Sequence, residues 1–379
     1  MPSFKPTELW EVAPHTLAKV EIVRQYLVRW FQILGRGHPS KRLLYIDGFA
    51  GPGEYANSKD SSPVAALSAA KDAIDTAPDL RNKEVVFLFV EKEQWCAEHL
   101  RSLVQQTEWP KNIKWEVLHG TFDDQVGGIL ERVRKQGQKL APTFAFIDPF
   151  GATGLPFSII QEILGYRSCE VLLNLDSDGI GRLFKASGQP WNRDHLNAMF
   201  GDDSWERELS PHAPMAALSG QVLKLYKKRL RSIPNVRYVF PFSMGDQHGR
   251  LTYHLVFASQ HPRGLEKMKE AMESVDKSGS YSFSDATAGE ALLPFDFKDP
   301  APAARKMQVA LGGMARPYAD FHDYALTETP FRNPKQMLEQ LKSQRQVEVV
   351  WNVASPPKRG FPEEKITSIL VQREANQLF

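Results

Sequence analysis

Short apolar runs alternate with helical patterns along most of the chain. The runs that predict strands are residues 43–46, 85–90, 113–118, 144–147, 171–175, 236–242 and 251–258. Apolar residues spaced three and four apart predict helices over residues 8–34, 63–77, 93–107, 124–136, 156–165, 218–232 and 262–275. This alternation predicts the α/β class, with a doubly wound, seven-stranded, mostly parallel sheet of the Rossmann-like kind. The last two strands lie closer together in sequence, so an antiparallel pair fits there.

Changes in composition divide the chain. We expect an N-terminal helical segment over residues 1–37 and the α/β domain over residues 38–275. Residues 276–303 are rich in Ser, Gly, Asp and Pro, which predicts a linker. Residues 304–379 follow as a separate small module.

The small module has a recognisable order of elements. Helical patterns near residues 317–327 and 334–344 precede an apolar strand over 347–351 and a basic turn at 356–360. Two helices followed by a strand and a basic hairpin predict a winged-helix-like module, which is a relative of the helix-turn-helix.

Composition narrows the class of protein. The chain has 379 residues, of which 42% are hydrophobic and 24% charged, which excludes a wholly disordered chain. It contains neither a secretory signal nor a run of about 18 apolar residues, so we expect a cytoplasmic protein without membrane contact. Two cysteines, Cys96 and Cys169, are too few for a disulfide framework or a multi-cysteine metal site, and we expect no metal. The net charge is only +2, so any surface for nucleic acid must be a local basic patch.

A glycine-rich loop, Asp47-Gly48-Phe49-Ala50-Gly51-Pro52-Gly53, directly follows the first predicted strand. Ligands of doubly wound sheets bind beyond the carboxyl ends of the strands, and glycine lets a ligand approach the backbone closely. The order Gly-x-x-Gly-x-Gly differs from the dinucleotide fingerprint, and residues 54–61 separate the glycines from the next helix at Ser62-Pro63. A ligand without phosphates is therefore favoured. The alternative is a tight turn that binds nothing.

The second strand ends at a carboxylate. Glu91 can accept hydrogen bonds from both hydroxyls of a ribose, as acidic residues do at this position of nucleotide-binding sheets. Glu93 lies two residues on and is a competitor for this role. The alternative is a solvated charge at the strand end.

The loop after the third strand can contact the same ligand. Thr121 can hydrogen-bond an adenine edge while Phe122 packs on the face of the base. The alternative is a helix cap, because Asp123 or Asp124 precedes a helical pattern.

The fourth strand ends in Asp148-Pro149-Phe150-Gly151. The Asp148 carboxylate and the Pro149 carbonyl can both accept hydrogen bonds from an exocyclic amine and so orient its lone pair. The Phe150 ring can stack on the base that carries the amine, and such stacking contributes about 1–3 kcal/mol. The alternative is a simple Asp-Pro turn.

These motifs in this order resemble class I S-adenosylmethionine-dependent methyltransferases. They are similar to the branch that methylates amino nitrogens of nucleic-acid bases, whose fourth motif is Asp/Asn-Pro-Pro-Tyr/Phe. Here Phe150 and Gly151 replace the second proline and the aromatic residue. The resemblance implies S-adenosylmethionine as cofactor and Asp148 as the acceptor of the amine. It implies cofactor contacts for Asp47, Phe49, Gly51, Gly53, Glu91, Thr121 and Phe122.

The chain also resembles the three-Cys-motif partner protein (TcmP) family. The matching stretches are Pro14-His15-Thr16-Leu17-Ala18-Lys19, residues 44–53, Ser62-Pro63, residues 147–151 and residues 253–259. This resemblance implies a methyltransferase-like fold and a three-Cys-motif protein as partner.

Basic residues at both ends of the chain are candidates for substrate contacts. His15 and Lys19 lie four residues apart on one helix face and can reach the ligand site; the alternative is a solvated face. Arg332, Lys335, Lys358 and Arg359 in the small module can contact the phosphates of tRNA or DNA. The alternative is a solvated face of a protein-interaction module.

We therefore expect a methyltransferase that acts on an amino nitrogen of a base in DNA or RNA. An alternative from another class is a non-catalytic, methyltransferase-like scaffold that binds a partner protein or nucleic acid. A nicotinamide-dependent enzyme is disfavoured by the order of the glycines.

Overall fold

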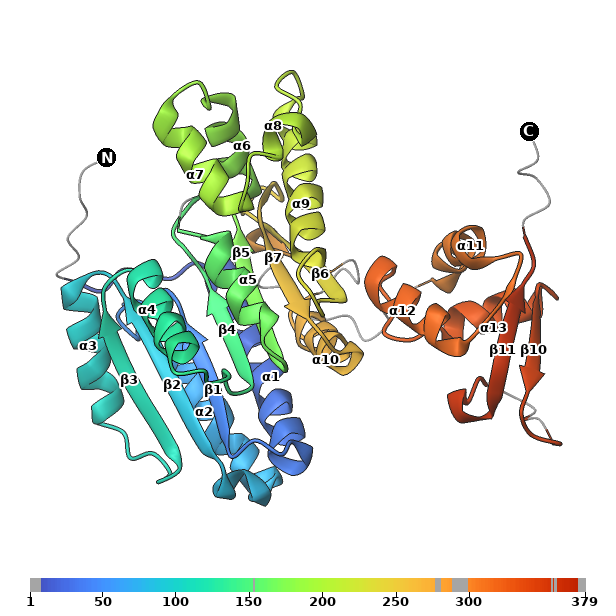
Figure 1. Ribbon diagram of the computed structural model, residues 1–379, viewed down its shortest axis with the longest axis horizontal. Helices are drawn as coiled ribbons and strands as arrows, with labels where there is room; N and C mark the ends of the chain where they lie inside the picture. The colour runs from blue at the N-terminus through green and yellow to red at the C-terminus, as the bar shows by residue number, and fades with distance from the viewer. Residues whose placement is uncertain are drawn as a thin grey trace. The chain divides into compact units, whose positions relative to one another are not determined.

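The computed structural model describes residues 8–152, 154–276, 281–287, 299–355, 357 and 360–373 (Figure 1). The chain divides into two compact units. Of the described residues, the first unit contains those up to 276 together with 281–287, and the second contains those from 299 to 373.

An eight-stranded sheet in the order β3-β2-β1-β4-β5-β7-β6-β8 forms the centre of the first unit. Its strands are β1 (Arg42–Asp47), β2 (Glu84–Glu91), β3 (Ile113–His119), β4 (Thr143–Ile147), β5 (Cys169–Leu175), β6 (Tyr238–Gly245), β7 (Leu251–Ser259) and β8 (Ser282–Ser284). Strands β1 to β5 are parallel, and β7 runs antiparallel between β5 and β6. The carboxyl ends of β2, β1, β4 and β5 therefore lie side by side at one edge of the sheet.

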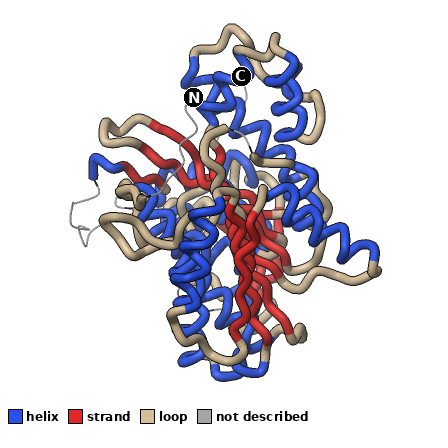
Figure 2. The backbone as a smooth tube through the Cα atoms, turned by 90° about the vertical axis from the view of Figure 1, so that its left-hand side faces the viewer, coloured by secondary structure: helices blue, strands red, loops and turns tan. Residues whose placement is uncertain are grey.

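Helices cover both faces of this sheet (Figure 2). On one face α1 (Pro14–Gly37) contacts α2 (Ser62–Thr76) and α10 (Pro262–Glu273). On the other face α4 (Phe122–Lys135) contacts α5 (Phe157–Gly165), and α6 (Ser177–Lys185) contacts α9 (Met215–Arg231). The remaining helices are α3 (Gln94–Gln105), beside β2 and β3, and α7 (Pro190–Phe200) and α8 (Trp205–Glu208), which follow α6.

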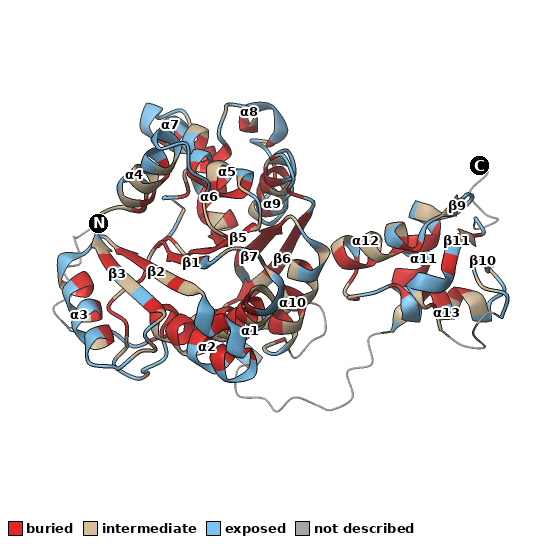
Figure 3. Cartoon of the chain, turned by 60° about the horizontal axis from the view of Figure 1, so that its bottom comes forward, coloured by how far each residue is buried: buried red, intermediate tan, exposed pale blue. Residues whose placement is uncertain are grey.

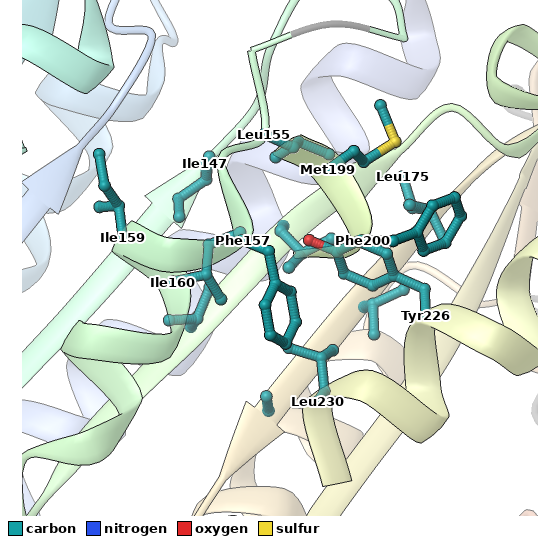
Figure 4. Packing of buried hydrophobic residues seen from close by; sticks show 14 of the residues in the cluster. Ile147, Leu155, Phe157, Ile159, Ile160, Leu175, Met199, Phe200, Tyr226 and Leu230 are labelled. Atoms are coloured by element: carbon teal, nitrogen blue, oxygen red, sulfur yellow. The ribbon is translucent and has the colours of Figure 1, made fainter. Parts of the chain in front are cut away.

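The core lies between the sheet and these helices, and the central strands are buried along most of their length (Figure 3). On the face of α4, α5 and α9, the rings of Phe157, Phe200 and Tyr226 meet aliphatic side chains of β4 and β5 (Figure 4). Strands buried on both faces must be apolar throughout, which is why the apolar runs of the sequence locate them.

The fold confirms the predicted α/β class and all seven predicted strands. The fold differs from the elements predicted from the sequence at three places. The first helix begins at Pro14, not residue 8, because proline is favoured at the first helical position and restricts the residue before it. Helices α6, α7 and α8 were not predicted. Residues 281–287, expected within a linker, form β8 and a 3-10 turn, and β8 pairs with β6.

The predicted N-terminal segment also belongs to the first unit. Helix α1 buries a stripe that includes Val23, Tyr26, Leu27 and Phe31. The Tyr26 ring packs on Phe144 in β4, with the ring centroids 5.0 Å apart. Helix α1 is therefore one of the layers of the α/β unit.

The second unit has its own small core. Its elements are α11 (Pro300–Leu311), β9 (Ala315–Arg316), α12 (Tyr318–Glu328), α13 (Lys335–Ser343), β10 (Val347–Trp351) and β11 (Ile366–Val371). The strands form an antiparallel sheet in the order β10-β11-β9, and side chains including Met307, Phe321 and Leu338 fill the core. The two helices and the strand predicted near 317–351 are confirmed. Helix α11 begins inside the segment expected to be a linker.

Among the described residues, no helix combines the length and the apolar character needed to cross a membrane.

Candidate functional site

Asp47 ends β1 as a fully buried carboxylate. Its Oδ1 accepts a hydrogen bond from the Phe49 backbone N–H at 3.3 Å, and its Oδ2 accepts one from the Tyr45 hydroxyl at 3.3 Å. Burial raises the pKa of Asp47 to about 7, and the nearby charge of Asp148 adds to this effect. Asp47 therefore stabilises the glycine loop from within, and a ligand at this edge does not touch it directly.

The two predicted cofactor glycines differ in their surroundings. Both have left-handed backbones, with φ of +66° at Gly51 and +91° at Gly53. A Cβ atom on Gly51 would meet no atom within 4 Å, whereas one on Gly53 would lie 2.7 Å from the Leu100 side chain on α3. Gly51 thus borders open space, and Gly53 is required by packing of the loop against α3.

Glu91 reaches back from β2 to this loop. Its Oε2 accepts a hydrogen bond from the Gly51 N–H at 2.8 Å, and its Oε1 accepts one from the Glu93 N–H at 2.7 Å. Burial raises the pKa of Glu91. Glu93 is exposed at the start of α3, so the carboxylate beside the glycine loop is that of Glu91.

The start of α2 also belongs to the glycine loop, which corrects the expected separation between them. The helix is capped by Ser61, whose hydroxyl donates to the Gly53 carbonyl at 2.5 Å. The side chain of Ser62 hydrogen-bonds Asp47. The intervening residues turn back on themselves through the bridge between Tyr55 and Ser58, which brings the two ends of the loop together.

Thr121 and Phe122 differ from their predicted roles. Thr121 is the N-cap of α4, and its hydroxyl accepts a hydrogen bond from the Asp124 N–H at 3.2 Å. Phe122 is only 2% exposed, and its ring stacks on Phe49 with centroids 5.8 Å apart. The predicted helix cap is confirmed at this loop, although the capping residue is Thr121. Because Phe122 fills the core beneath Gly48, it does not offer its face to an adenine.

Asp148 follows β4 and forms an ion pair with Lys19 of α1. The Lys19 Nζ donates to Oδ1 of Asp148 at 2.9 Å and to Oδ2 at 2.6 Å. The Asn174 Nδ2, from β5, donates to the same Oδ1 at 2.7 Å. Lys19 is 6% exposed, so it does not lie on a solvated face. Among the described residues, Oδ2 has Lys19 as its one hydrogen-bond partner, which leaves this oxygen a second lone pair.

Phe150 stands out from the surface next to this pair. Pro149 is buried, but Phe150 is fully exposed, and Gly151 follows with φ of +87°. An exposed phenylalanine beside a partly buried carboxylate is unusual, because burial of an aromatic side chain is normally favourable. The ring has no described packing partner and is available to an incoming molecule.

His15, the second candidate on α1, contacts two residues that the sequence did not mark as part of the site. Its Nδ1 lies 2.8 Å from Oδ2 of Asp285, just after β8, and its ring meets the Tyr253 ring edge-on. Asn174, Tyr253 and Asp285 were not among the predicted site residues. Asn174 carried a usable signal, since it is a polar residue within an otherwise apolar buried strand.

The basic residues of the second unit are only partly described. Lys335 is exposed at the start of α13, and Arg332 is half-buried before it. Lys358 and Arg359 lie outside the described residues.

Comparisons with known proteins give no family assignment. No protein-family model matches the chain, and no curated protein matches it. The chain is similar to an O-methyltransferase from Bacillus cereus solved in complex with SAH, at 12% identity over 62% of this chain and 79% of that one, with a TM-score of 0.34. It is also similar to a methyltransferase from Podospora anserina solved with SAH bound, at 12% identity over 61% and 76% of the two chains, with a TM-score of 0.28. Similarity at this level does not assign a substrate or a site residue.

Proposed function

We propose that the chain is an S-adenosylmethionine-dependent methyltransferase that acts on an amino nitrogen of a nucleic-acid base. One observation carries the proposal. The carboxyl ends of three strands are neighbours in the order β2-β1-β4. They carry, in the same order, the Glu91 carboxylate, the open backbone at Gly51 and the Asp148 carboxylate. Ligands of doubly wound sheets bind at this edge.

The residues of the glycine loop fit such a cofactor. A Cβ at Gly51 would enter open space, which leaves room for a ligand against the backbone. The Glu91 carboxylate accepts the backbone N–H groups of Gly51 and Glu93, and that of Lys92 also interacts with it, so it keeps a lone pair for a ribose hydroxyl. Gly51 would then pass the methionine end, and the buried Asp47 would hold the loop in shape. The cofactor, when bound, supplies an electrophilic methyl group on a sulfonium.

Asp148 would act on the acceptor amine. Its Oδ2 can accept one N–H of the amine, and the Pro149 carbonyl can accept the other, which points the nitrogen lone pair along the direction of attack. As the N–C bond formed, the bond between the methyl group and the sulfonium sulfur would break and leave a neutral thioether. The nitrogen would then carry one proton too many, and Oδ2 is the atom placed to take it. Holding the amine in this orientation contributes most of the rate, because transfer is a direct displacement. Phe150 would lie beside the base.

The second unit supports a nucleic-acid substrate. We propose that it is a winged-helix-like module, because its elements follow the order helix, strand, two helices and two strands, with a three-stranded antiparallel sheet. Lys335 is the first residue of α13, and Arg345 lies two residues after its end; both are exposed and can contact phosphates of tRNA or DNA. A three-Cys-motif protein remains the partner that the sequence resemblance implies.

The test is transfer of a labelled methyl group from S-adenosylmethionine to tRNA, duplex DNA and small amines. We expect Asp148→Ala to abolish transfer and to keep cofactor binding. Because this variant leaves the Lys19 ammonium buried without its partner, the double variant Lys19→Met/Asp148→Ala serves as the folded control. Full transfer activity in folded Asp148→Ala protein would refute the role of Asp148. A well-folded parent that binds no cofactor would favour the scaffold alternative instead.

A further inference from the structure

Tyr55 lies two residues beyond Gly53, in the loop that leads from the glycines to α2. The sequence did not mark it as a site residue. Its backbone N–H donates to the Ser58 carbonyl at 2.7 Å, which forms one half of the bridge between the two residues. Its half-buried ring meets the Trp10 ring edge-on, with the centroids 6.1 Å apart. The Tyr55 side chain is therefore held beside the glycine loop.

The segment before α1 also fixes this loop. The Ala56 N–H donates to the Trp10 carbonyl at 3.0 Å. Asn57 clasps the backbone of Val12, because its Oδ1 accepts from the Val12 N–H at 2.8 Å and its Nδ2 donates to the Val12 carbonyl at 3.2 Å. A loop held by contacts on both of its neighbouring segments presents Tyr55 in a defined position, as a binding site requires.

Two carboxylates determine the state of the Tyr55 hydroxyl. Asp47 ends β1, and Asp148 follows β4, which is the neighbouring strand. Burial, followed by the charges of Asp148 and Asp47, raises the pKa of the Tyr55 phenol, which therefore keeps its proton. A hydroxyl dipole orients in the surrounding field. These negative charges favour the orientation in which the hydrogen points toward them and the oxygen lone pairs point away.

The Tyr55 oxygen is available to a ligand. Among the described residues it has no hydrogen-bond partner, and unlike the hydroxyls of Tyr226 and Tyr253 it is not sealed from solvent. Because its lone pairs point away from the carboxylates, the group that it attracts must carry positive charge. The methyl hydrogens of a sulfonium carry such charge, whereas a thioether is neutral.

We propose that the Tyr55 hydroxyl oxygen contacts the methyl-sulfonium group of the bound cofactor and thereby favours it over the neutral thioether. Resting on the proposed function, this assignment adds Tyr55 as a further cofactor-binding residue. The contact is of the C–H···O type, which is weak for neutral groups and is strengthened here by the positive charge. Transfer of the methyl group removes that charge and with it the contact, which helps the product to leave.

Tyr55→Phe tests the contact, because it removes the hydroxyl and keeps the ring. The measurement is calorimetric titration with S-adenosylmethionine and with S-adenosylhomocysteine, in the absence of any methyl acceptor. We expect Tyr55→Phe to weaken binding of S-adenosylmethionine by about 2- to 5-fold, the effect of one such contact, and to leave binding of S-adenosylhomocysteine unchanged. The ratio of the second dissociation constant to the first should therefore fall by the same factor.

Tyr166→Phe is the matched control. Tyr166 is also half-buried, and its hydroxyl has no hydrogen-bond partner in the part of the chain that the structure describes. It follows α5 and precedes β5, so it lies at the amino end of the sheet, away from the glycine loop. Both substitutions should leave the midpoint of denaturant unfolding unchanged, and Tyr166→Phe should leave both dissociation constants unchanged.

An unchanged ratio in Tyr55→Phe would overturn the proposed contact. Equal loss of affinity for the two ligands would also overturn it, because the hydroxyl would then contact a part of the cofactor that both ligands share. Either result would leave the proposed cofactor site intact, since the parent protein binds. If the parent bound neither ligand, the proposed function would fail together with the contact, and the parent titration alone would show it.

Discussion

Lys19 Nζ donates to both carboxylate oxygens of Asp148, which lies 129 residues further along the chain. This pair connects α1 to the end of β4, where we place the acceptor amine. Lys19 and Asp148 have side-chain exposures of 8% and 18%, so water screens the pair only weakly. The helix that precedes the sheet in sequence is thereby part of the candidate site.

Breaking this pair should destabilise the first unit. Lys19→Met leaves a partly buried carboxylate without its cation, and the expected cost is about 3 kcal/mol in the free energy of unfolding. Lys19→Met/Asp148→Leu removes both charges and should recover most of that loss. Denaturant unfolding of the three proteins measures both effects.

A surface pair provides the control. Lys135 and Glu131 form an i,i+4 pair with side-chain exposures of 72% and 50%, and Lys135→Met should change stability by less than about 0.5 kcal/mol. Equal effects of Lys19→Met and Lys135→Met would show that the Lys19–Asp148 pair is not effectively buried.

Asp47 should make stability depend on pH in a defined direction. Its pKa of about 7 in the folded chain lies above the usual 3.8. Between these pH values the folded chain holds a proton that the unfolded chain has released. The contribution of Asp47 to the free energy of unfolding is therefore fully present below pH 4 and is lost as the pH rises toward 7. The slope is at most about 1.4 kcal/mol per pH unit.

Asp47→Asn removes this ionisation and keeps the shape of the side chain. Relative to that variant, the parent should lose about 2 kcal/mol of unfolding free energy between pH 5 and pH 7. Denaturant unfolding at the two pH values measures the difference. Parallel pH dependence of the two proteins would mean that the folded-state pKa of Asp47 is not raised.

The fold could be predicted from sequence where burial is local and could not where it depends on distant contacts. Strands such as β5 are apolar throughout, so their position follows from their own residues. The three-residue β8 carries no such pattern and exists because it pairs with β6. Helices α6 and α7 have only nine and eleven residues, which is too short for a clear helical period in the sequence.

The residues of the candidate site also differ in whether their own sequence surroundings or distant contacts place them. Gly51, Glu91 and Asp148 each follow a predictable strand, and parallel strands bring their ends together. Phe122 could equally have faced a ligand or the core, and only its packing against Phe49 decides between them. Tyr253 and Asn174 meet through the register of an antiparallel pair, which no local pattern specifies.

The second unit should bind nucleic acid through phosphate contacts. In the full chain, Lys335→Gln/Arg345→Gln should weaken binding of tRNA or duplex DNA and reduce the slope of log K against log salt concentration by about 1 to 2. Lys71→Gln/Lys111→Gln, at exposed positions of the first unit, is the control. If the salt dependence of binding is unchanged in Lys335→Gln/Arg345→Gln, the phosphate contacts are made by other residues.

Gly51 has a matched counterpart in Gly137. Both have left-handed backbones, with φ of +66° and +62°, and a Cβ on either would meet no atom within 4 Å. Gly51→Asp and Gly137→Asp should therefore lower the unfolding free energy by similar amounts, about 1 kcal/mol, since aspartate tolerates this backbone better than most residues. Gly137 follows α4, away from the carboxyl edge of the sheet, so only Gly51→Asp should affect a ligand there.

Calorimetric titration with S-adenosylmethionine and S-adenosylhomocysteine tests the central claim most directly. We predict micromolar binding by the parent protein and by Gly137→Asp, and loss of binding in Gly51→Asp. Absence of binding to the folded parent, or equal binding by the two aspartate variants, would contradict a cofactor site at the glycine loop.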